Sequence, residues 1–484
     1  MSVMNLQAVE AEDAVPLFAA SRKVYPQSVK GTFRRLKWIL LWVCLGIYYV
    51  LPFLRWARGP NQPHQAVLID FDHSRFYFFF IELWPQEVYY FTGLLVIASL
   101  ALFLVNALIG RAWCGFTCPQ TVWTDLFIWV ERAIEGDRRE RMKLDAAPWT
   151  RDKIVKRVAK HAIWLAIAWW TGGAFVLYFA DAPTLVGQLA TYQASVTVWI
   201  SIGILTFTTY YLAGHMREQF CLNMCPWPRI QAALTDSDAL NITYRNDRGE
   251  PRMSLKQATR ARAASLPAGD CIDCNQCVAV CPTGVDIRQG LQPGCIQCGL
   301  CIDACDSVMT KVHRPIRLIA YDTDDNVRRR KSREKVVFRP IGGRTIAYSA
   351  TIVFVGALML YQLATRQHLS LSAMHIRAPL FTTTHDGGIR DGYTLRLANK
   401  WSDARKFAIT IEGLKDASLK SEQADVSTDA KLIVEVDPDS NQEIDLFVSA
   451  PRASLDGPSA SVVFRATDVG SGEATEASDH FFGP

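Results

Sequence analysis

Two cysteine-rich stretches decide how the middle of this chain folds: CIDCNQCVAVCP at residues 271–282 and CIQCGLCIDACD at residues 295–306. Each has four cysteines in the spacing C-x2-C-x2-C-x3-C, and the second stretch repeats the first 24 positions later. In this pattern the first three thiolates of a run bind one [4Fe–4S] cluster, and the fourth binds the cluster of the other run. The sequence therefore predicts cluster 1 on Cys271, Cys274, Cys277 and Cys305, and cluster 2 on Cys295, Cys298, Cys301 and Cys281.

Structural zinc is the alternative use for so many thiolates. Zinc sites seldom contain a triple run of this kind that occurs twice, so the spacing disfavours zinc. A proline follows Cys281, as in ferredoxins, whereas Asp306 replaces the proline after Cys305. A carboxylate at that position disfavours added negative charge on the cluster, so we expect it to lower the reduction potential.

Four further cysteines form a second pair of motifs, WCGFTCP at residues 113–119 and FCLNMCP at residues 220–226. Each motif follows a long apolar run, and cysteines four positions apart share one face of a helix. Soft thiolates select Cu(I) among physiological metals, and a thioether adds a further soft ligand. Copper binding, a redox dithiol and structural cysteines all stay open as interpretations. The candidate catalytic and copper-binding residues are Cys114, Cys118, Cys221 and Cys225, with Met224 as an additional ligand.

Five apolar runs are long enough, or nearly so, to cross a lipid bilayer, which takes about 20 helical residues. They lie at residues 38–54, 88–110, 161–180, 194–213 and 344–364. The sequence therefore predicts a multidomain membrane protein with a five-helix transmembrane α domain, in which residues 38–213 hold the first four helices.

Basic residues predict the orientation of these helices, because cytoplasmic loops are enriched in Lys and Arg. The loop at 111–160 is strongly basic, whereas residues 181–193 contain no Lys or Arg. The N-terminal segment 1–37, that loop and the region 214–343 are therefore predicted to be cytoplasmic, with a two-cluster bacterial-ferredoxin-like domain at about residues 262–315. Binding of nucleic acid is disfavoured, because the basic residues cluster beside the apolar runs rather than on one soluble face.

The tail at residues 365–484 is acidic, contains no cysteine and alternates apolar with polar residues. The alternating stretches lie at residues 393–398, 406–411, 432–436, 444–448 and 460–464. Short strands at this spacing predict an immunoglobulin-like β-sandwich, here without an inter-sheet cysteine pair. The fifth apolar run would export this domain to the oxidising side of the membrane, which suits a segment without thiols.

Several other stretches carry a family resemblance. They are residues 111–125, 216–221, 225–231, 377–381 and 386–399. Together with the cluster runs, they resemble the CcoG/FixG/RdxA family of accessory proteins of cbb-type cytochrome oxidases, nearly from end to end. Asp306 fits that family's pattern, whereas Asp391 stands where the pattern leads us to expect asparagine.

The resemblance implies a multi-pass protein of the bacterial inner membrane, with two [4Fe–4S] clusters in the cytoplasm and the immunoglobulin-like domain in the periplasm. It also implies a role in assembling the oxidase by reducing Cu(II) to Cu(I), so that copper is the substrate or a bound ion. The expected partners are oxidase subunits or assembly factors, a membrane copper transporter, and an electron donor that the sequence does not identify.

Reduction of copper is the leading hypothesis, and it makes the protein a cupric reductase whose clusters pass electrons to the CxxxC cysteines. Quinol-linked electron transfer to another acceptor, with those thiols as a redox dithiol, is the second hypothesis. The third is a redox-sensing assembly scaffold. No nicotinamide, flavin or nucleotide motif is present in the sequence, so electrons must come from a partner or from a quinol.

Overall fold

The computed structural model describes most of the chain as two compact units, Met1–Ala357 and Leu358–Pro484. The described residues are 23–58, 62–366, 368–384, 387–401, 403–421, 425–426, 431–438, 440–455 and 457–483. Residues 1–22 of the predicted N-terminal segment lie outside them.

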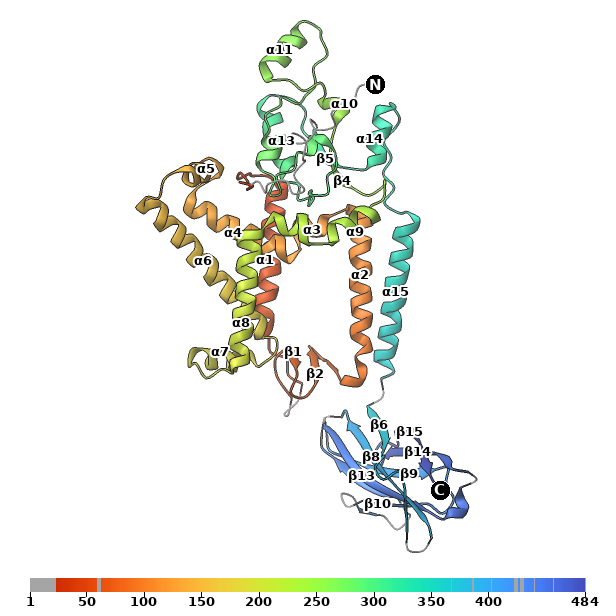
Figure 1. The fold of residues 1–484 in the computed structure, drawn as a ribbon. Helices are drawn as coiled ribbons and strands as arrows, with labels where there is room; N and C mark the ends of the chain where they lie inside the picture. Colours follow the sequence, from red (N-terminus) through yellow and green to blue (C-terminus); the bar gives the residue numbers. More distant parts are fainter. Residues whose placement is uncertain are drawn as a thin grey trace, which may run out of the picture. The chain divides into compact units, whose positions relative to one another are not determined.

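Four helices in the described residues are long and apolar enough to cross a membrane. They are α1 (Thr32–Val50) with the 3-10 turn η1 (Leu51–Phe53), α2 (Tyr89–Ile109), α8 (Val196–Thr209) with the π-helix η3 (Tyr210–Met216), and α15 (Gly343–Ala364). In the first unit α2 and α15 run side by side, and the rings of Phe103 and Tyr348 lie 6.0 Å apart (Figure 1).

The predicted span at residues 161–180 is not one of these four helices. It falls on α6 (Arg151–Val176), which begins ten residues earlier and carries five Lys or Arg residues before position 161. The apolar part that remains is about 24 Å long at 1.5 Å per residue, which is less than the roughly 30 Å core of a bilayer. The predicted count of five spanning helices is therefore not confirmed.

The basic region at 111–160 is mostly helical rather than an open loop. It contains α3 (Ala112–Phe116), α4 (Pro119–Glu135), α5 (Arg138–Ala146) and the start of α6. Pro119 occupies the first turn of α4, where a missing N–H costs nothing, and Gly136 ends it with a positive φ. Leu126 packs with Leu41 and Leu45 of α1, and Phe127 packs on Trp164 of α6. Burial on more than one side of α4 holds it between α1 and α6.

Shorter elements complete the first unit. A three-stranded sheet, whose first strand contacts η1 at the end of α1, forms from β1 (Val67–Asp70), β2 (Arg75–Phe78) and β3 (Ile81–Leu83). The other short elements are η2 (Pro85–Glu87), α7 (Ala182–Ala190), the π-helix η4 (Phe220–Met224), α9 (Trp227–Leu234), α10 (Asn246–Gly249), α11 (Leu255–Ala263), η5 (Ile287–Gln289) and α14 (Asp324–Lys331).

The cysteine runs lie in a module closed by two antiparallel strands, β4 (Asn241–Tyr244) and β5 (Ile319–Asp322). Between them the first run leads into α12 (Gln276–Ala279) and the second into α13 (Leu300–Lys311). The core of the module consists of apolar side chains and cysteines together, so the thiols are part of the packing. The strands extend the module beyond the predicted boundaries of 262–315.

The second unit is a two-sheet β-domain. One sheet has the order β10-β13-β8-β6, with β7 paired to β8, and the other has the order β11-β12-β9-β14-β15. Their bounds are β6 Leu369–His375, β7 Thr382–Thr383, β8 Ile389–Asn399, β9 Arg405–Glu412, β10 Ser418–Ser421, β11 Asp425–Val426, β12 Leu432–Val436, β13 Ser440–Ala450, β14 Ser459–Asp468 and β15 Ala474–Phe482. All five predicted stretches are strands, and their alternate apolar residues fill a single core between the sheets.

Candidate metal centre

The first cysteine cavity lies beside α12. Four of its lining residues are the predicted ligands of cluster 1, namely Cys271, Cys274, Cys277 and Cys305. Three of these come from the first run and one from the second, so the structure brings together the crossed set that the ferredoxin pattern predicts.

A second cavity lies next to the first. Its lining includes the four predicted ligands of cluster 2, Cys281, Cys295, Cys298 and Cys301. Cys277 lines both cavities, so the two sites share a wall.

The backbone wraps in the same way around both cavities. Asp273 and Asn275 have positive φ values, and so do Gln297 and Gly299, which lie 24 positions later. In each run these two left-handed residues flank the second cysteine. Left-handed residues turn the chain back on itself, so that successive thiols face one centre rather than alternate sides. The sequence repeat is therefore a repeat of conformation.

The acid–base state of these thiols fits a metal cluster better than free cysteine. Burial raises the pKa of both Cys295 and Cys305 to about 12, and it also raises the pKa of Cys301 well above its ordinary value. A buried thiol with such a pKa stays protonated and inert near neutral pH unless a metal replaces the proton. Two cavities lined by four cysteines each fit a [4Fe–4S] cluster, which would store and pass single electrons.

A different arginine lies beside each of the two cavities. Arg288 lines the first cavity and donates to the side chains of Asp273 and Asn275 at 2.5 Å each. On the second-cavity side, Arg111 donates to the carbonyl oxygens of Pro293 at 2.5 Å and Cys295 at 3.4 Å. Positive charge close to a cluster favours its reduced form.

The Asp306 carboxylate is paired in the structure, so its negative charge should act less strongly on cluster 1 than the sequence predicts. One of its carboxylate oxygens accepts the backbone N–H of Arg317 at 2.7 Å, and the Arg317 Nε lies 3.5 Å from the other. Because a guanidinium offsets the carboxylate, the expected lowering of the cluster potential is reduced. The direction of that effect stays a prediction.

The first CxxxC motif does not lie on one helix face, and that expectation was wrong. Cys114 belongs to α3, but α3 ends at Phe116, and Cys118 is the extended residue that precedes α4, with ψ at 129°. A proline disfavours helical geometry in the residue before it, so Pro119 breaks the helix at Cys118.

The second motif repeats this geometry. Cys221 lies in the π-helix η4, and Cys225 is extended, with ψ at 121°, before Pro226. In both motifs the first thiol therefore sits on a helical turn, and the second sits on the extended residue that leads into the next helix. Met224, proposed as an additional ligand, is 59% exposed, whereas the four thiols are half-buried.

The structure brings the two motifs together. The thiols of Cys118, Cys221 and Cys225 all act electrostatically on Cys114, and with burial as the largest cause they raise the pKa of its thiol to about 12. Burial likewise raises the pKa of Cys221 to about 12. Both a redox dithiol and a metal site require these thiols to lose their protons, so both interpretations stay open.

The four thiols do not form a closed single-ion site. Within the described part of the chain, no three or more His, Cys, Asp or Glu side chains converge closely enough to hold one metal ion. A single copper ion therefore finds at most two protein ligands of these types at once before any rearrangement.

Both motifs pack against the loop that carries the second cysteine run. A Cβ on Gly115 would lie 2.6 Å from the carbonyl oxygen of Ile296 and 3.0 Å from the Cα of Cys298. From the other motif, the Leu222 side chain approaches Gly294 so closely that a Cβ there would lie 2.8 Å from it. The CxxxC thiols are thus adjacent to the second cavity.

Three polar residues that support the contact between the CxxxC motifs and the second cysteine run were not anticipated from the sequence. The Cys114 thiol donates to the Gln231 side chain at 3.3 Å, and the backbone N–H of Arg111 donates to the Gln297 side chain at 2.8 Å. Arg111 follows a membrane helix, and its charge had been explained as a topology signal. Only the fold shows that it reaches the second cysteine run.

Three family models match the chain. A 4Fe-4S dicluster domain matches residues 216–324, and a 4Fe-4S binding domain matches residues 91–135. The third is the IG-like fold at the C-terminus of FixG, which matches residues 359–484. Iron–sulfur domains and a C-terminal immunoglobulin-like domain are therefore confirmed.

Known relatives cover almost the whole chain. The nitrogen fixation protein FixG of Rhizobium meliloti is 47% identical over 466 residues, which is 90% of this chain and 88% of that protein. The chain belongs to the FixG/RdxA family. Protein RdxA of Cereibacter sphaeroides is 46% identical over 442 residues, covering 91% of this chain and 92% of that protein, and RdxB of the same organism is 46% identical over 409 residues.

Membership of the FixG/RdxA family confirms the resemblance drawn from the motifs and makes this chain an iron–sulfur redox protein. The match at residues 91–135 contains only two cysteines, Cys114 and Cys118, so it cannot complete a four-thiolate cluster alone. Whether these thiols serve iron or copper is a matter of proposal.

Proposed function

We propose that the protein is a cupric reductase of a bacterial inner membrane, which supplies Cu(I) for assembly of a cbb-type cytochrome oxidase. Cys271, Cys274, Cys277 and Cys305 hold one [4Fe–4S] cluster, and Cys281, Cys295, Cys298 and Cys301 hold the other. The CxxxC thiols bind the copper. This proposal joins the family's association with oxidase assembly to the geometry of the site.

The close approach of Gly115 to Cys298 is the observation that supports this function best. It puts the Cys114 helix in van der Waals contact with a backbone that carries ligands of cluster 2. Copper bound beside that helix is therefore next to the electron store, with no other element between them. Soft thiolates stabilise Cu(I) over Cu(II), which favours the reduction.

The sidedness belongs to the same proposal. We place the cysteine module and both CxxxC motifs in the cytoplasm and the immunoglobulin-like domain in the periplasm, because the segments around the motifs are rich in Lys and Arg. A partner in oxidase assembly would contact the periplasmic domain, and a membrane copper transporter would take up Cu(I) in the cytoplasm.

The test is to replace Cys114 and Cys118 with serine in the purified, anaerobic protein and to measure Cu(II) binding and reduction. Cys44→Ser is the matched control, since Cys44 is a half-buried free cysteine of α1 outside both motifs. We expect the double variant to keep its clusters and lose copper reduction, and the control to keep both. Unchanged binding and reduction in the double variant would overturn the copper assignment.

Metal analysis separates copper from iron at these thiols. Two [4Fe–4S] clusters require about eight irons per chain, whereas a third cluster on the CxxxC cysteines would raise this to about twelve. The proposal expects about eight irons and a copper content that falls in the double variant.

A further inference from the structure

The cluster 1 site is the part of the cysteine module that reaches the surface. Of the eight predicted cluster ligands, Cys274 alone is exposed, and its neighbours Asp273 and Asn275 are exposed as well. The second cavity lies across the shared wall at Cys277 and is adjacent to the CxxxC motifs. A path for electrons from the surface to those motifs therefore begins at Cys274.

A strongly basic segment lies next to this exposed loop. Residues 252–268, which contain α11, have four Lys or Arg residues and no Asp or Glu. The backbone N–H of Met253 donates to the carbonyl oxygen of Cys271 at 3.5 Å, two residues before α11 begins. The segment thus runs alongside the first cysteine run.

Arg252 links this basic segment to the rim of the first cavity. Arg288, which lines that cavity, is hydrogen-bonded to Asp286 and lowers the pKa of its carboxyl group, and the charge of Arg252 contributes to the same shift. Arg288 also donates to Asp273 beside the exposed Cys274. The basic segment and the exposed ligand therefore border the same part of the module.

Helix α11 is held in place by capping rather than by packing. Of its nine residues only Ala258 is buried. Its first turn is fixed by a capping box, in which Ser254 and Gln257 each accept the backbone N–H of the other. Figure 1 shows α11 on the far side of the cysteine module from α1 and α2. A polar helix in this position suits a soluble partner rather than a lipid surface.

Two cations of α11 have no acidic partner. The carboxylate of Asp270 is already engaged by Arg262 at 2.9 Å and by Arg248 at 3.0 Å. Among the residues that the structure describes, no carboxylate lies within 4.0 Å of Lys256 or Arg260. These two exposed residues are four positions apart, so they project from one helix face.

We propose that the Lys256–Arg260 face of α11 docks a small acidic electron-carrier protein of the ferredoxin type, which delivers electrons to the module at the exposed Cys274 edge. This inference rests on the cluster assignment within the proposed function and not on copper. Each encounter moves one electron, so the carrier is oxidised by one electron and cluster 1 is reduced by one, with no change in bonds or protons. Opposite charges suit such brief encounters, because they speed association without a large buried interface.

The experiment uses the full-length anaerobic protein in detergent, with an acidic plant-type ferredoxin as the probe. Stopped-flow absorbance follows cluster reduction by the reduced ferredoxin, and a separate titration gives the Kd between the two oxidised proteins. Replacing both cations, Lys256→Glu with Arg260→Glu, should lower the association rate at low salt about tenfold and weaken binding to a similar degree. The wild-type rate should fall as salt is added, whereas the rate of the variant should change little.

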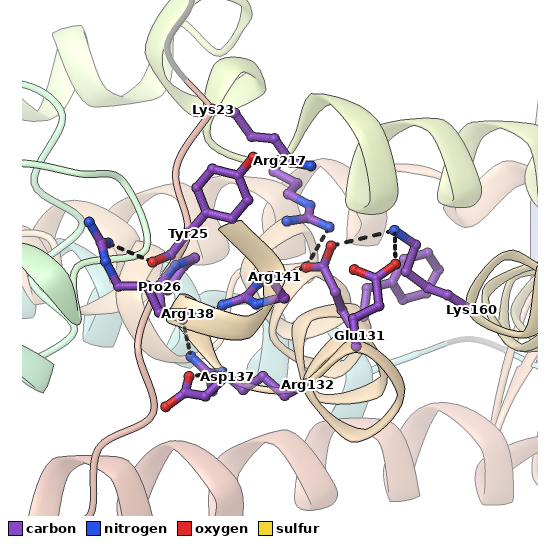
Figure 2. A network of polar contacts seen from close by, with 12 residues as sticks. Lys23, Tyr25, Pro26, Glu131, Arg132, Asp137, Arg138, Arg141, Lys160 and Arg217 are labelled. Atoms are coloured by element: carbon purple, nitrogen blue, oxygen red, sulfur yellow. Dashed lines mark hydrogen bonds and ion pairs between the residues drawn. The ribbon is translucent and has the colours of Figure 1, made fainter. Parts of the chain in front are cut away.

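Helix α5 supplies the matched control. Arg139 and Lys143 are likewise exposed, basic and four positions apart, whereas Arg141 between them binds Glu131 at 2.9 Å (Figure 2). Arg139→Glu with Lys143→Glu makes the same change in charge and should keep the rate and the Kd within about twofold of the wild type. A wild-type rate in the α11 variant, or an equal loss in the α5 variant, overturns the docking site.

An uncharged small reductant separates failure of the docking site from failure of the proposed function. Photoreduced deazariboflavin needs no docking surface, so it should reduce the clusters equally fast in the wild type and in both variants. If it does not reduce clusters in the wild type, the cluster assignment of the proposed function fails. If it does, and reduction by ferredoxin is indifferent to Lys256 and Arg260, only the docking site is wrong. Equal slowing of the α11 variant with both reductants also overturns the docking site, since that loss would not depend on the carrier.

Discussion

The carboxylate of Asp303 accepts the backbone N–H of Arg34 at 2.8 Å and that of Phe33 at 3.2 Å. Asp303 lies between two predicted cluster ligands, Cys301 and Cys305, whereas Phe33 and Arg34 form the first turn of α1. A residue of the cysteine module thus caps the first membrane helix. Gly31 permits the contact, because a Cβ there would lie 2.2 Å from the Asp303 carboxyl carbon.

Loss of this cap should loosen the start of α1. Asp303→Ala removes the acceptor of two free helix N–H groups, which costs about 0.5–2 kcal/mol. We expect faster hydrogen exchange at the amides of Phe33 and Arg34, with the iron content unchanged. Ser307→Ala, at an exposed position of the same helix α13, is the control. Wild-type exchange rates in Asp303→Ala would show that the cysteine module does not anchor α1.

Gly115 should control the rate of electron transfer between the two sites. Gly115→Ala places a methyl group against Ile296 and Cys298, which pushes the Cys114 helix away from the second cysteine run. We expect slower Cu(II) reduction with the cluster content unchanged. Gly187→Ala is the matched control, since a Cβ at Gly187 meets no atom within 4 Å. Equal rates in both variants would refute direct transfer across this contact.

Glu131 should be a major source of stability in the first unit. Its side chain is 2% exposed and lies close to Arg141, Lys160 and Arg217. Glu131→Gln leaves Arg141 and Arg217 without their shared anion, whereas Lys160 keeps Glu135 at 2.8 Å, and we expect a cost of about 3–5 kcal/mol. A clear drop in the melting temperature of the detergent-solubilised protein is expected, but only a small one for the exposed control Asp152→Asn.

The same carboxylate predicts the direction of a pH dependence. Burial opposes ionisation of Glu131, but Arg217, Arg141 and Lys160 outweigh it and hold its pKa below 4.5. A lowered pKa stabilises the fold fully above pH 4.5, and this contribution is lost as the pH falls through the lowered value. Glu131→Gln should therefore show a smaller loss of stability on acidification than the wild type. Parallel acid profiles would contradict this.

Asp391 should destabilise the immunoglobulin-like domain at neutral pH. Its side chain is fully buried, and it accepts the backbone N–H of Phe482 at 2.6 Å and lies 3.3 Å from the His375 ring. Burial raises its pKa above 3.8, against the effects of Phe482 and His375. A raised carboxyl pKa favours the protonated form, so ionisation costs stability as the pH rises from 3.8.

Asp391→Asn removes that cost and keeps an acceptor for Phe482. We expect the melting temperature of the domain to rise at pH 7 and to match the wild type near pH 3.5, as followed by calorimetry of the full-length protein. This gives a physical meaning to the asparagine that the family pattern led us to expect at this position. A lower melting temperature at pH 7 would contradict the account.

The cysteine module was the most predictable part of the molecule. Ligand spacing determines which thiols can face one centre, so the crossed sets with Cys281 and Cys305 follow from the sequence alone. The strands of residues 365–484 were equally predictable from the sequence, because the alternation of apolar and polar residues indicates which face of each strand is buried.

The backbone geometry of the two CxxxC motifs could have been predicted from the sequence, but the expectation of one helix face was wrong. Pro119 and Pro226 each force the preceding cysteine out of a helix, and this signal outweighs the spacing of four residues. The predicted count of five membrane helices is not confirmed, since the hydropathy of residues 161–180 does not reveal that their helix begins at Arg151.

The tertiary contacts could not have been derived. Nothing in the local pattern around Gly115 indicates that its missing side chain makes room for the loop at Ile296 and Cys298.

The central claim is that electrons stored at the cysteine module reduce copper at the CxxxC thiols. It is tested most directly by mixing anaerobic, fully reduced protein with Cu(II) and following cluster oxidation and Cu(I) formation together. The account predicts one Cu(I) for each electron lost by the clusters, and loss of both signals when Cys114, Cys118, Cys221 and Cys225 are replaced with serine. Cluster oxidation at the wild-type rate in that variant, or oxidation without Cu(I), would contradict it.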